Sequence, residues 1–302
     1  MTTRPEAGAA IGPAPAAPEV PLRRRGLVRL SRFSVVRPVA ALAPVVCGLI
    51  VLVAVFAPLL APHDPNAVDP LNAFASASAA HPLGTDDLGR DLLSRLITGS
   101  RSSLAGPFVV VVAAGLAGTA LAVSAAWIGG WFDAAVSRLL DIMFAFPGLV
   151  LAITVAAVFG PGFVAPVVAL SVAYVPVIAR VMRAAAMRER NLPYIEALRV
   201  QGFSSWHICL RHLLPNLVPL LLVQAAIGFG YAMVDLASIS FLGLGLQPPV
   251  ADWGLMIANG QPSILAGSPQ QSLYAAIAVV IAVVAFTAVA ERLALRFGGG
   301  AR

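Results

Sequence analysis

The feature that most constrains this chain is a set of long apolar stretches that carry almost no charge. A helix needs about 20 apolar residues to cross the hydrocarbon of a bilayer. Inside the bilayer it must satisfy its own backbone hydrogen bonds, which excludes open strands. Six stretches reach or approach this length: 39–60, 104–127, 139–159, 163–179, 217–242 and 273–290. We therefore expect an all-α integral membrane protein with six transmembrane helices.

The composition excludes several classes of function. Charged residues make up only 11% of the chain, against about 25% in soluble domains. All 20 basic residues are arginine, so the lysine of a P-loop ATPase is missing. We expect a non-catalytic subunit without cofactor or metal. Cys47 and Cys209 are too isolated to form a metal site or a disulfide framework. The other metal-ligating side chains outside the apolar stretches match no ligand spacing: His63, Asp64, His81 and Asp86.

The placement of the arginines predicts the orientation. Seventeen of the 20 lie before the first apolar stretch, between the second and third, between the fourth and fifth, or after the sixth. Loops rich in arginine stay in the cytoplasm, so both termini are expected there. The net charge of +6 is thus a topology signal, and we expect no nucleic-acid partner.

The chain divides into four expected regions: a disordered basic tail over 1–30, the first helix with an outside loop over 31–103, a five-helix core over 104–295, and a cytoplasmic tail over 296–302. In the outside loop, Thr85 suits a helix N-cap and Gly99 suits a helix end. An amphipathic helix is therefore predicted over residues 86–98, with Asp86 and Asp87 in its first turn.

The arginine-rich loop 184–216 contains the most informative pattern. Pro193 suits the first position of a short helix, Glu196 lies near the positive end of its dipole, and Gly202 suits the left-handed residue that ends it. Ser204 or Ser205 then caps a second helix. Five residues of this second helix are expected to share an apolar face: Trp206, Leu210, Leu213, Leu214 and Leu217. Two prolines, Pro215 and Pro219, are expected to interrupt or redirect the helix. The pattern fits either a docking helix or a plain interfacial linker.

Two acids fall inside apolar stretches, where ionisable side chains are functional candidates. Asp141 lies three residues from Arg138, so a local ion pair is the simpler interpretation and a gating role the alternative. Asp235 lies deeper, and it either lines a pore or hydrogen-bonds a neighbouring helix. A proton-coupled secondary transporter would use both acids as relay groups. The sequence lacks the inverted repeat that is typical of many secondary transporters, which argues against that class.

Glu-Ala-Leu at 196–198, followed by Gly202 and by Leu-Pro at 214–215, resembles the EAA loop of ATP-binding-cassette (ABC) importer permeases. Two departures are Leu198, where the family has a second Ala, and His212, where it has Ile. Further strings resemble the C-type subunits of the oligopeptide and dipeptide branch: HPLGTDDLGRDLLSR at 81–95, FPGLVLAI at 146–153, SFLGLGLQPP at 240–249 and DWG at 252–254. The resemblance covers about residues 30–295.

This resemblance implies a type I ABC importer permease in the cytoplasmic membrane that imports di- or oligopeptides. Relatives of the same branch import nickel complexes, glutathione or other small solutes. The implied partners are a homologous second permease, two ABC ATPase subunits and an extracytoplasmic substrate-binding protein, with membrane lipid around them. The family role of ATPase coupling falls on Tyr194, Glu196, Ala197, Gly202, Leu214 and Pro215, and a pore or gating role on Asp235 and Asp141. The outside helix becomes a candidate contact for the binding protein.

Overall fold

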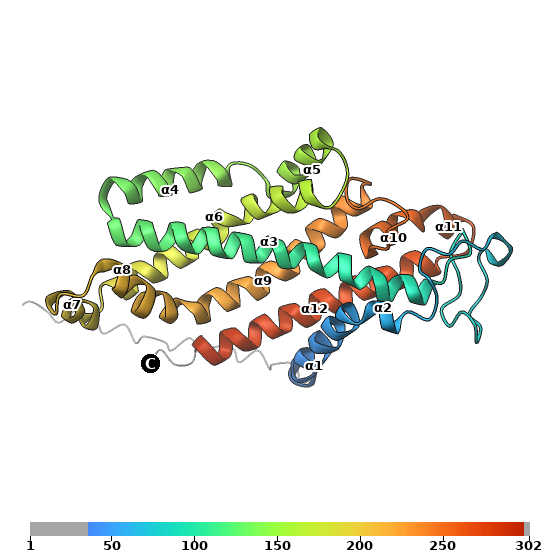
Figure 1. Ribbon diagram of the computed structural model, residues 1–302, viewed down its shortest axis with the longest axis horizontal. Helices are drawn as coiled ribbons and strands as arrows, with labels where there is room; N and C mark the ends of the chain where they lie inside the picture. Colours follow the sequence, from blue (N-terminus) through green and yellow to red (C-terminus); the bar gives the residue numbers. More distant parts are fainter. Residues whose placement is uncertain (1–35, 299–302) are drawn as a thin grey trace, which may run out of the picture.

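The computed structural model describes residues 36–298, which form an elongated bundle of helices (Figure 1). Thr85 and Asp91 form one isolated β-bridge. The predicted tail 1–30 lies outside the described residues, as does the end of the tail 296–302. The helices, with a 3₁₀ turn and a π-helical turn, are α1 Val36–Val55, α2 Ala57–Leu60, the 3₁₀ turn Pro70–Asn72, α3 Leu92–Ile128, α4 Gly130–Phe144, α5 Gly148–Phe159, α6 Val164–Arg190, α7 Pro193–Val200, α8 Ser205–Ile208, the π-helical turn Cys209–Leu213, α9 Leu214–Phe241, α10 Trp253–Asn259, α11 Gln261–Leu265 and α12 Gln270–Gly298.

Four helical segments within the described residues are long and apolar enough to cross a membrane. They are α3, α6, the run from α8 through α9, and α12. The pair α4 and α5 would add a fifth if the two count as one span, and α1 contributes a shorter apolar stretch, Leu42–Val55. The predicted class, a helical protein with several membrane spans, is confirmed.

The third predicted span, 139–159, is not one helix. The chain bends by 73° between α4 and α5. Pro147 lies at this break with an extended backbone (φ −59°, ψ 123°). Proline has no N–H to donate and disfavours helical conformation in the residue before it, here Phe146. The apolar pattern runs through this position without a change, and only the proline marks the break.

The predicted separate helix over 86–98 is also wrong. Asp86 turns its carboxylate onto the N–H groups of Leu88 and Arg90, and Gly89 has a left-handed φ of 75°. The helix therefore begins only at α3, which Asp91 caps by accepting a 2.8 Å hydrogen bond from Ser94 N–H. From there α3 continues without a break into the second apolar stretch.

The predicted end of that helix, Gly99, lies within α3. A Cβ on Gly99 would lie 3.2 Å from Trp253 Cδ1. The glycine therefore allows close approach between α3 and the start of α10, and it does not end a helix.

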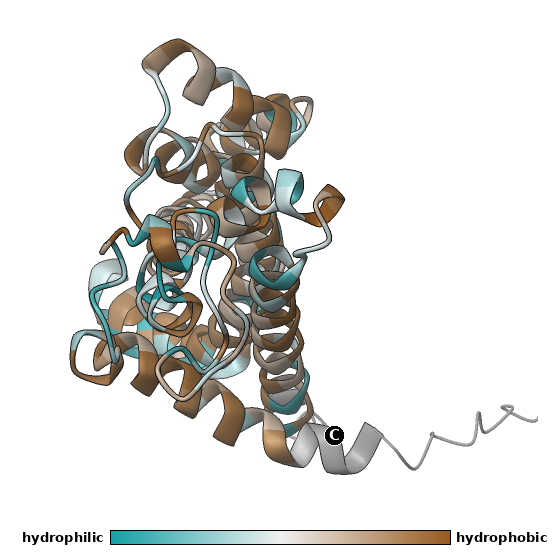
Figure 2. Cartoon of the chain, turned by 90° about the vertical axis from the view of Figure 1, so that its right-hand side faces the viewer, coloured by the Kyte–Doolittle hydropathy of each residue, from teal (hydrophilic) through white to brown (hydrophobic). Residues whose placement is uncertain are grey.

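Helix α3 lies at the centre of the bundle, packed along α6 and α9, while α12 packs along α9 and α1. The contact between α3 and α6 is built from small side chains, among them the fully buried Ala114, Ala122 and Ala179. Small residues let helices approach closely where lipid provides no hydrophobic drive. Figure 2, viewed from the end that carries residues 61–91, shows hydrophobic residues along the helices and hydrophilic residues on the connecting segments.

Candidate functional site

Helices α7 and α8 lie together at one end of the bundle (Figure 1). Pro193 occupies the first turn of α7, and Gly202 follows its end with φ 83°. Two hydrogen bonds close this end: Gly202 N–H donates to the Arg199 carbonyl at 3.0 Å, and Phe203 N–H to the Leu198 carbonyl at 3.2 Å. Ser204 then caps α8 by accepting from His207 N–H at 3.3 Å. The predicted geometry of two short helices joined at a left-handed glycine is confirmed.

Helix α7 is fastened to the end of α3. Ile195 is fully buried, and the Arg199 guanidinium lies over the Trp127 ring at 4.5 Å from the ring centroid. Arg190, at the end of α6, donates to the Ala126 carbonyl in the last turn of α3. A cation there also suits the negative end of the helix dipole. The first contact ties α7 to α3, and the second ties the end of α6 to the same turn of α3.

Tyr194 makes a second attachment. Its hydroxyl donates to Glu189 Oε1 at 2.6 Å, and Asn216 Nδ2 donates to the same carboxylate oxygen at 2.7 Å and to the tyrosine oxygen at 3.0 Å. Burial, and then the hydrogen bond to Glu189, raise the pKa of Tyr194 to about 12. The three side chains link α6, α7 and α9.

The outer surface of the α7–α8 end is formed by side chains that take no part in the attachments through Ile195, Arg199 and Tyr194. Glu196 and Ala197 are exposed on α7, Val200 is 85% exposed and Trp206 on α8 is 73% exposed. Charged, small and aromatic groups therefore face away from the bundle on a firmly attached element.

The predicted apolar face of the second helix is wrong for Trp206 and for Leu210, which is 45% exposed. Leu213 and Leu217 of that predicted face are buried, together with Ile208 and Cys209. A π-helical turn over Cys209–Leu213 holds one more residue than an α-helical turn. It rotates the upstream residues away from the face that the downstream ones bury.

The sequence predicts that Pro215 and Pro219 interrupt or redirect this helix; the interruption is wrong, because the helical run Ser205–Phe241 is continuous. Leu214 begins α9 half-buried, and Pro215 follows it exposed in the first turn. The π turn ends at Leu213, two residues before Pro215, where a regular α-helix would require the N–H that proline lacks. The irregular turn accommodates the proline without a break.

Asp235 and Tyr174 meet inside the bundle. The Tyr174 hydroxyl on α6 donates to Asp235 Oδ2 on α9 at 2.9 Å. Both residues line a hollow of about 450 Å³ that also includes Gln224 and Tyr231 and is bounded by the α4–α5 break. The hydrogen bond between helices that the sequence offered as one alternative is therefore present.

Asp141 pairs with Arg180 of α6 at 2.8 Å, so the predicted pair with Arg138 is wrong. The Arg180 guanidinium also lies over the Phe144 ring, 4.1 Å from its centroid. The sequence could not indicate this partner, because the pairing depends on α6 running beside α4. Both charged side chains are exposed.

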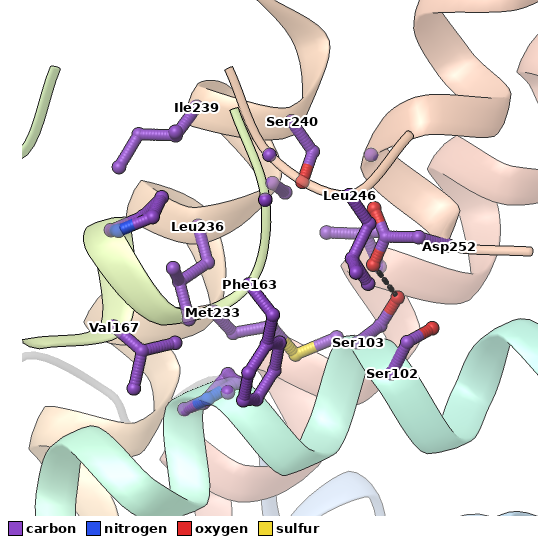
Figure 3. Close-up of a pocket in the computed structure, with 18 residues that line it drawn as sticks. Ser102, Ser103, Phe163, Val167, Met233, Leu236, Ile239, Ser240, Leu246 and Asp252 are labelled. Carbon is purple, nitrogen blue, oxygen red and sulfur yellow. Dashed lines mark hydrogen bonds between the residues drawn. The ribbon is translucent and has the colours of Figure 1, made fainter. Parts of the chain in front are cut away.

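A second polar constellation lies near the other end and joins α3 to α10 (Figure 3). Ser103 Oγ donates to Asp252 Oδ2 at 2.8 Å and accepts from Trp253 N–H at 2.9 Å. Trp253 Nε1 donates to the Leu96 carbonyl at 2.9 Å. The adjoining cavity measures about 30 Å³, room for one water. These hydrogen bonds hold α3 and the start of α10 together. The sequence marked the Asp-Trp-Gly string but could not indicate that it contacts α3.

In the segment before α3, the structure brings His63 and His81 to opposite sides of Asp91. Of the polar residues considered from sequence, Asp64 and Asp86 lie outside this group. Asp91 was not a candidate from the sequence because the predicted helix 86–98 places it inside a helix, whereas in the structure it is the N-cap of α3.

Two family models match the chain. Residues 118–299 match the binding-protein-dependent transport system inner membrane component, and residues 36–79 match the N-terminal TM domain of oligopeptide transport permease C. The chain is 40% identical over 76% of both proteins to the probable D,D-dipeptide transport system permease protein DdpC of Escherichia coli. It is 35% identical over 80% of both to the dipeptide transport system permease protein DppC of Alkalihalophilus pseudofirmus. It is 37% identical to the glutathione transport system permease protein GsiD of Pectobacterium atrosepticum, over 84% of this chain and 85% of the relative.

Among solved structures, the fold resembles a chain of the MetNI methionine ABC transporter in an inward-facing conformation. The match has a TM-score of 0.56 at 21% identity and covers 68% of this chain and 97% of the other.

Proposed function

This chain belongs to the family of binding-protein-dependent transport system inner membrane components, and on that premise we propose that it is a permease subunit of an ATP-driven peptide importer. The observation that carries the coupling role is the helix–glycine–helix end of the bundle, whose anchors face inward and whose Glu196 and Ala197 face outward. An element held this way can pass a displacement of a bound partner into the long helices.

The partners follow from the same premise. A homologous second permease would complete the pathway, two ABC ATPase subunits would bind the permease pair, one of them at the α7–α8 end of this chain, and an extracytoplasmic binding protein would deliver the substrate. ATP hydrolysis belongs to the ATPase subunits. A proton-coupled transporter is less well supported, since it has no use for an exposed helix–glycine–helix element. DdpC and DppC are named for dipeptides and GsiD for glutathione, itself a tripeptide, so peptides are the substrate class we propose.

The membrane arrangement we propose has six spans with both termini in the cytoplasm. Four of the spans are the long apolar segments. The bent pair α4–α5, taken as one span, is the fifth, and α1, a 20-residue helix, is the sixth. The arginine distribution supports this orientation. Asp235 and Tyr174 would then lie at the solute path, where the hollow beside α4 and α5 supports a pore-lining position. The Asp141–Arg180 pair, which bridges α4 and α6, is a second candidate for gating.

The coupling role is tested by paired variants that separate docking from folding. Glu196→Ala removes an exposed carboxylate from the first turn of α7 and should cost well under about 1 kcal/mol of stability. A Cβ at position 202 would meet no atom within 4 Å. Gly202→Val is therefore opposed by its φ of 83° alone, at about 1–2 kcal/mol. Gly202→Asn is the matched control, because asparagine tolerates left-handed backbone.

The measurements are co-purification of the ATPase subunits and uptake of a labelled dipeptide in cells. We expect normal membrane insertion of all three variants, loss of uptake in Glu196→Ala and Gly202→Val with weaker ATPase retention, and near-normal uptake in Gly202→Asn. Parent-like uptake and full ATPase retention in both of the first two variants would mean that this end of the bundle is only a linker.

A further inference from the structure

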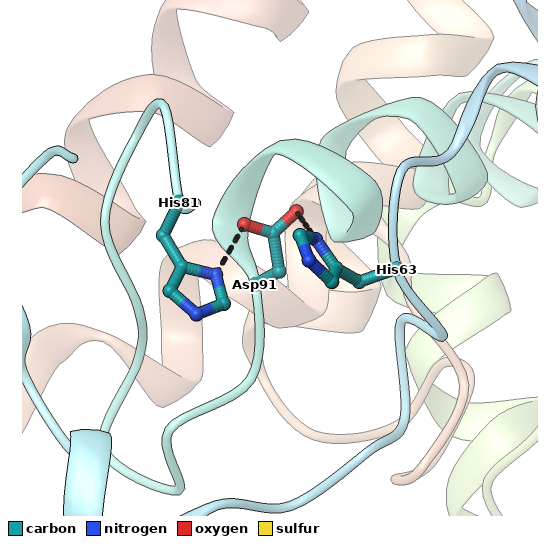
Figure 4. A group of neighbouring side chains, drawn as sticks. All are labelled: His63, His81 and Asp91. Atoms are coloured by element: carbon teal, nitrogen blue, oxygen red, sulfur yellow. Dashed lines mark hydrogen bonds and ion pairs between the residues drawn. The ribbon is translucent and has the colours of Figure 1, made fainter. Parts of the chain in front are cut away.

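Three side chains from separate parts of the segment before α3 converge on one point (Figure 4). His81 Nδ1 lies 3.1 Å from Asp91 Oδ1, and His63 Nδ1 lies 3.8 Å from Asp91 Oδ2. The imidazole centroids are 5.0 Å apart. One ligating atom from each residue can be chosen so that all three lie within 4.8 Å of one another.

The surrounding hydrogen bonds hold these three residues in place. Asp91 Oδ2 accepts from both the N–H and the hydroxyl of Ser94, at 2.8 and 2.6 Å. The same hydroxyl accepts from the backbone N–H of His63 at 3.0 Å, while Ser78 Oγ accepts from the backbone N–H of His81 at 3.1 Å. One serine therefore orients the carboxylate and one histidine together. Oriented ligands of this kind are what tight metal sites require.

The burial of the three side chains leaves one route for a cation. The Asp91 carboxylate is almost fully buried, whereas the side chains of His63 and His81 are 42% and 23% exposed. The open side of the cluster is therefore the imidazole side, through which an ion can enter.

We propose that His63, His81 and Asp91 form a zinc site that ties the segment 61–91 to the start of α3. Imidazole nitrogen with one carboxylate suits Zn²⁺ better than Mg²⁺ or Ca²⁺, which prefer all-oxygen sites. Zinc bonds of about 2.0–2.2 Å place tetrahedral ligand atoms roughly 3.3 Å apart. His81 Nδ1 and Asp91 Oδ1 are already close to that separation, at 3.1 Å, and the more exposed His63 would have to move inward. Water would complete the coordination.

The test uses the full-length chain in lipid nanodiscs, stripped with a chelator and titrated with Zn²⁺ by calorimetry. We expect one site, and a loss of affinity of at least about tenfold in His63→Ala and in His81→Ala. X-ray absorption of the zinc-loaded protein should show nitrogen ligands at about 2.0–2.1 Å. Asp91→Asn keeps an N-cap for α3 but removes the anionic ligand, so it should weaken binding without loss of fold.

The chain supplies its own control, since His207 and His212 form another histidine pair at the opposite end, with ring centroids 5.8 Å apart. His207→Ala/His212→Ala should bind zinc like the parent. Zinc should raise the midpoint of thermal unfolding in the parent and in this control, and not in His63→Ala/His81→Ala. Absence of binding to the parent, binding unchanged in the His63→Ala/His81→Ala variant, or loss of binding in the control would each overturn the proposal.

Discussion

At the scale of single residues, Asp86 stabilises the fold of the segment before α3 through buried ion pairs. Its carboxylate is 1% exposed. It accepts from Arg90 Nε at 2.6 Å and lies 3.6 Å from Arg95 Nε, whose side chain is fully buried and also donates through Nη1 to the Pro65 carbonyl. Asp86 therefore neutralises two buried guanidinium groups. It is unsuited to the outside contact that the sequence suggested, whereas Asp87 is exposed.

Asp86→Asn should be strongly destabilising, because it removes the anion beside the buried Arg95 and leaves the buried Arg90 with only the more exposed Asp87, 3.7 Å from its Nη2. Removing one partner of a buried pair costs about 3–5 kcal/mol. Asp87→Asn, one residue away, removes a carboxylate that is 43% exposed and pairs with Arg90 at 3.7 Å, so it should cost no more than about 1 kcal/mol. Equilibrium unfolding of the purified protein in mixed micelles measures both. Equal effects of the two variants would contradict the burial of this cluster.

Tyr194 should titrate abnormally. Its pKa is raised to about 12 from an ordinary value of 10.0. A raised pKa favours the neutral phenol in the folded state. This contribution to stability is complete below about pH 10 and is lost as the pH rises from there through about 12. The difference in alkaline phenolate absorbance between the parent and Tyr194→Phe should therefore appear near pH 12. A midpoint near 10 would mean that the link to Glu189 and Asn216 does not form.

At the scale of elements, the contact between α3 and α6 depends on the absence of one side chain. A Cβ on Gly118 would lie 3.0 Å from the Val175 carbonyl oxygen and 3.1 Å from Ala179 N, both backbone atoms that cannot rotate away. Gly118→Ala should therefore force the helices apart and destabilise the protein by about 1–3 kcal/mol.

Gly115, one turn earlier on α3, provides the comparison. Its added Cβ would lie 3.6 Å from Leu221 Cδ1, an ordinary contact with a flexible side chain. Gly115→Ala should be neutral or stabilising by up to about 1 kcal/mol, since alanine favours helix over glycine. Thermal unfolding in detergent ranks the two variants. A Gly118→Ala protein as stable as Gly115→Ala would place α3 and α6 farther apart than described.

The elements also show what sequence reasoning could reach. Local signals worked where one residue type decides the geometry: Pro193 starts α7, Gly202 ends it and Ser204 caps α8. They failed where geometry depends on a neighbour. The helix start at Asp91 depends on how Asp86 folds back on its own loop, and the partner of Asp141 depends on a helix about 40 residues away. Hydropathy detected the third apolar stretch but is insensitive to the bend within it.

At the scale of the whole molecule, α3 connects the two ends that carry polar chemistry. It begins at the capping Asp91, beside the two histidines, and its last turn carries Trp127, on which Arg199 of α7 packs. With 37 residues it is about 55 Å long. The helix is continuous over this length. It therefore connects the proposed ATPase surface to the segment 61–91 through a single element.

The orientation of the whole molecule can be measured with engineered thiols. The native Cys47 and Cys209 are both buried, 9% and 8% exposed, so they are poor probes, and Cys47→Ala/Cys209→Ala gives a silent background. In that background, Val200→Cys places a thiol on the 85% exposed end of α7, and Leu71→Cys places one on the 96% exposed segment before α3.

Expressed without its partners, the chain should react with a membrane-impermeant maleimide at position 71 in intact spheroplasts. Position 200 should react only in inverted vesicles. These outcomes follow from the arginines, because 17 of the 20 lie on the side of α7 in the proposed topology and arginine-rich loops are retained in the cytoplasm. The cysteine-free background variant controls for labelling at sites other than the introduced thiols. Detergent-solubilised protein should label at both positions, which controls for shielding by lipid. The reverse pattern in the two preparations would place α7 outside, where no ATPase could reach Glu196, and would overturn the proposed coupling together with the orientation.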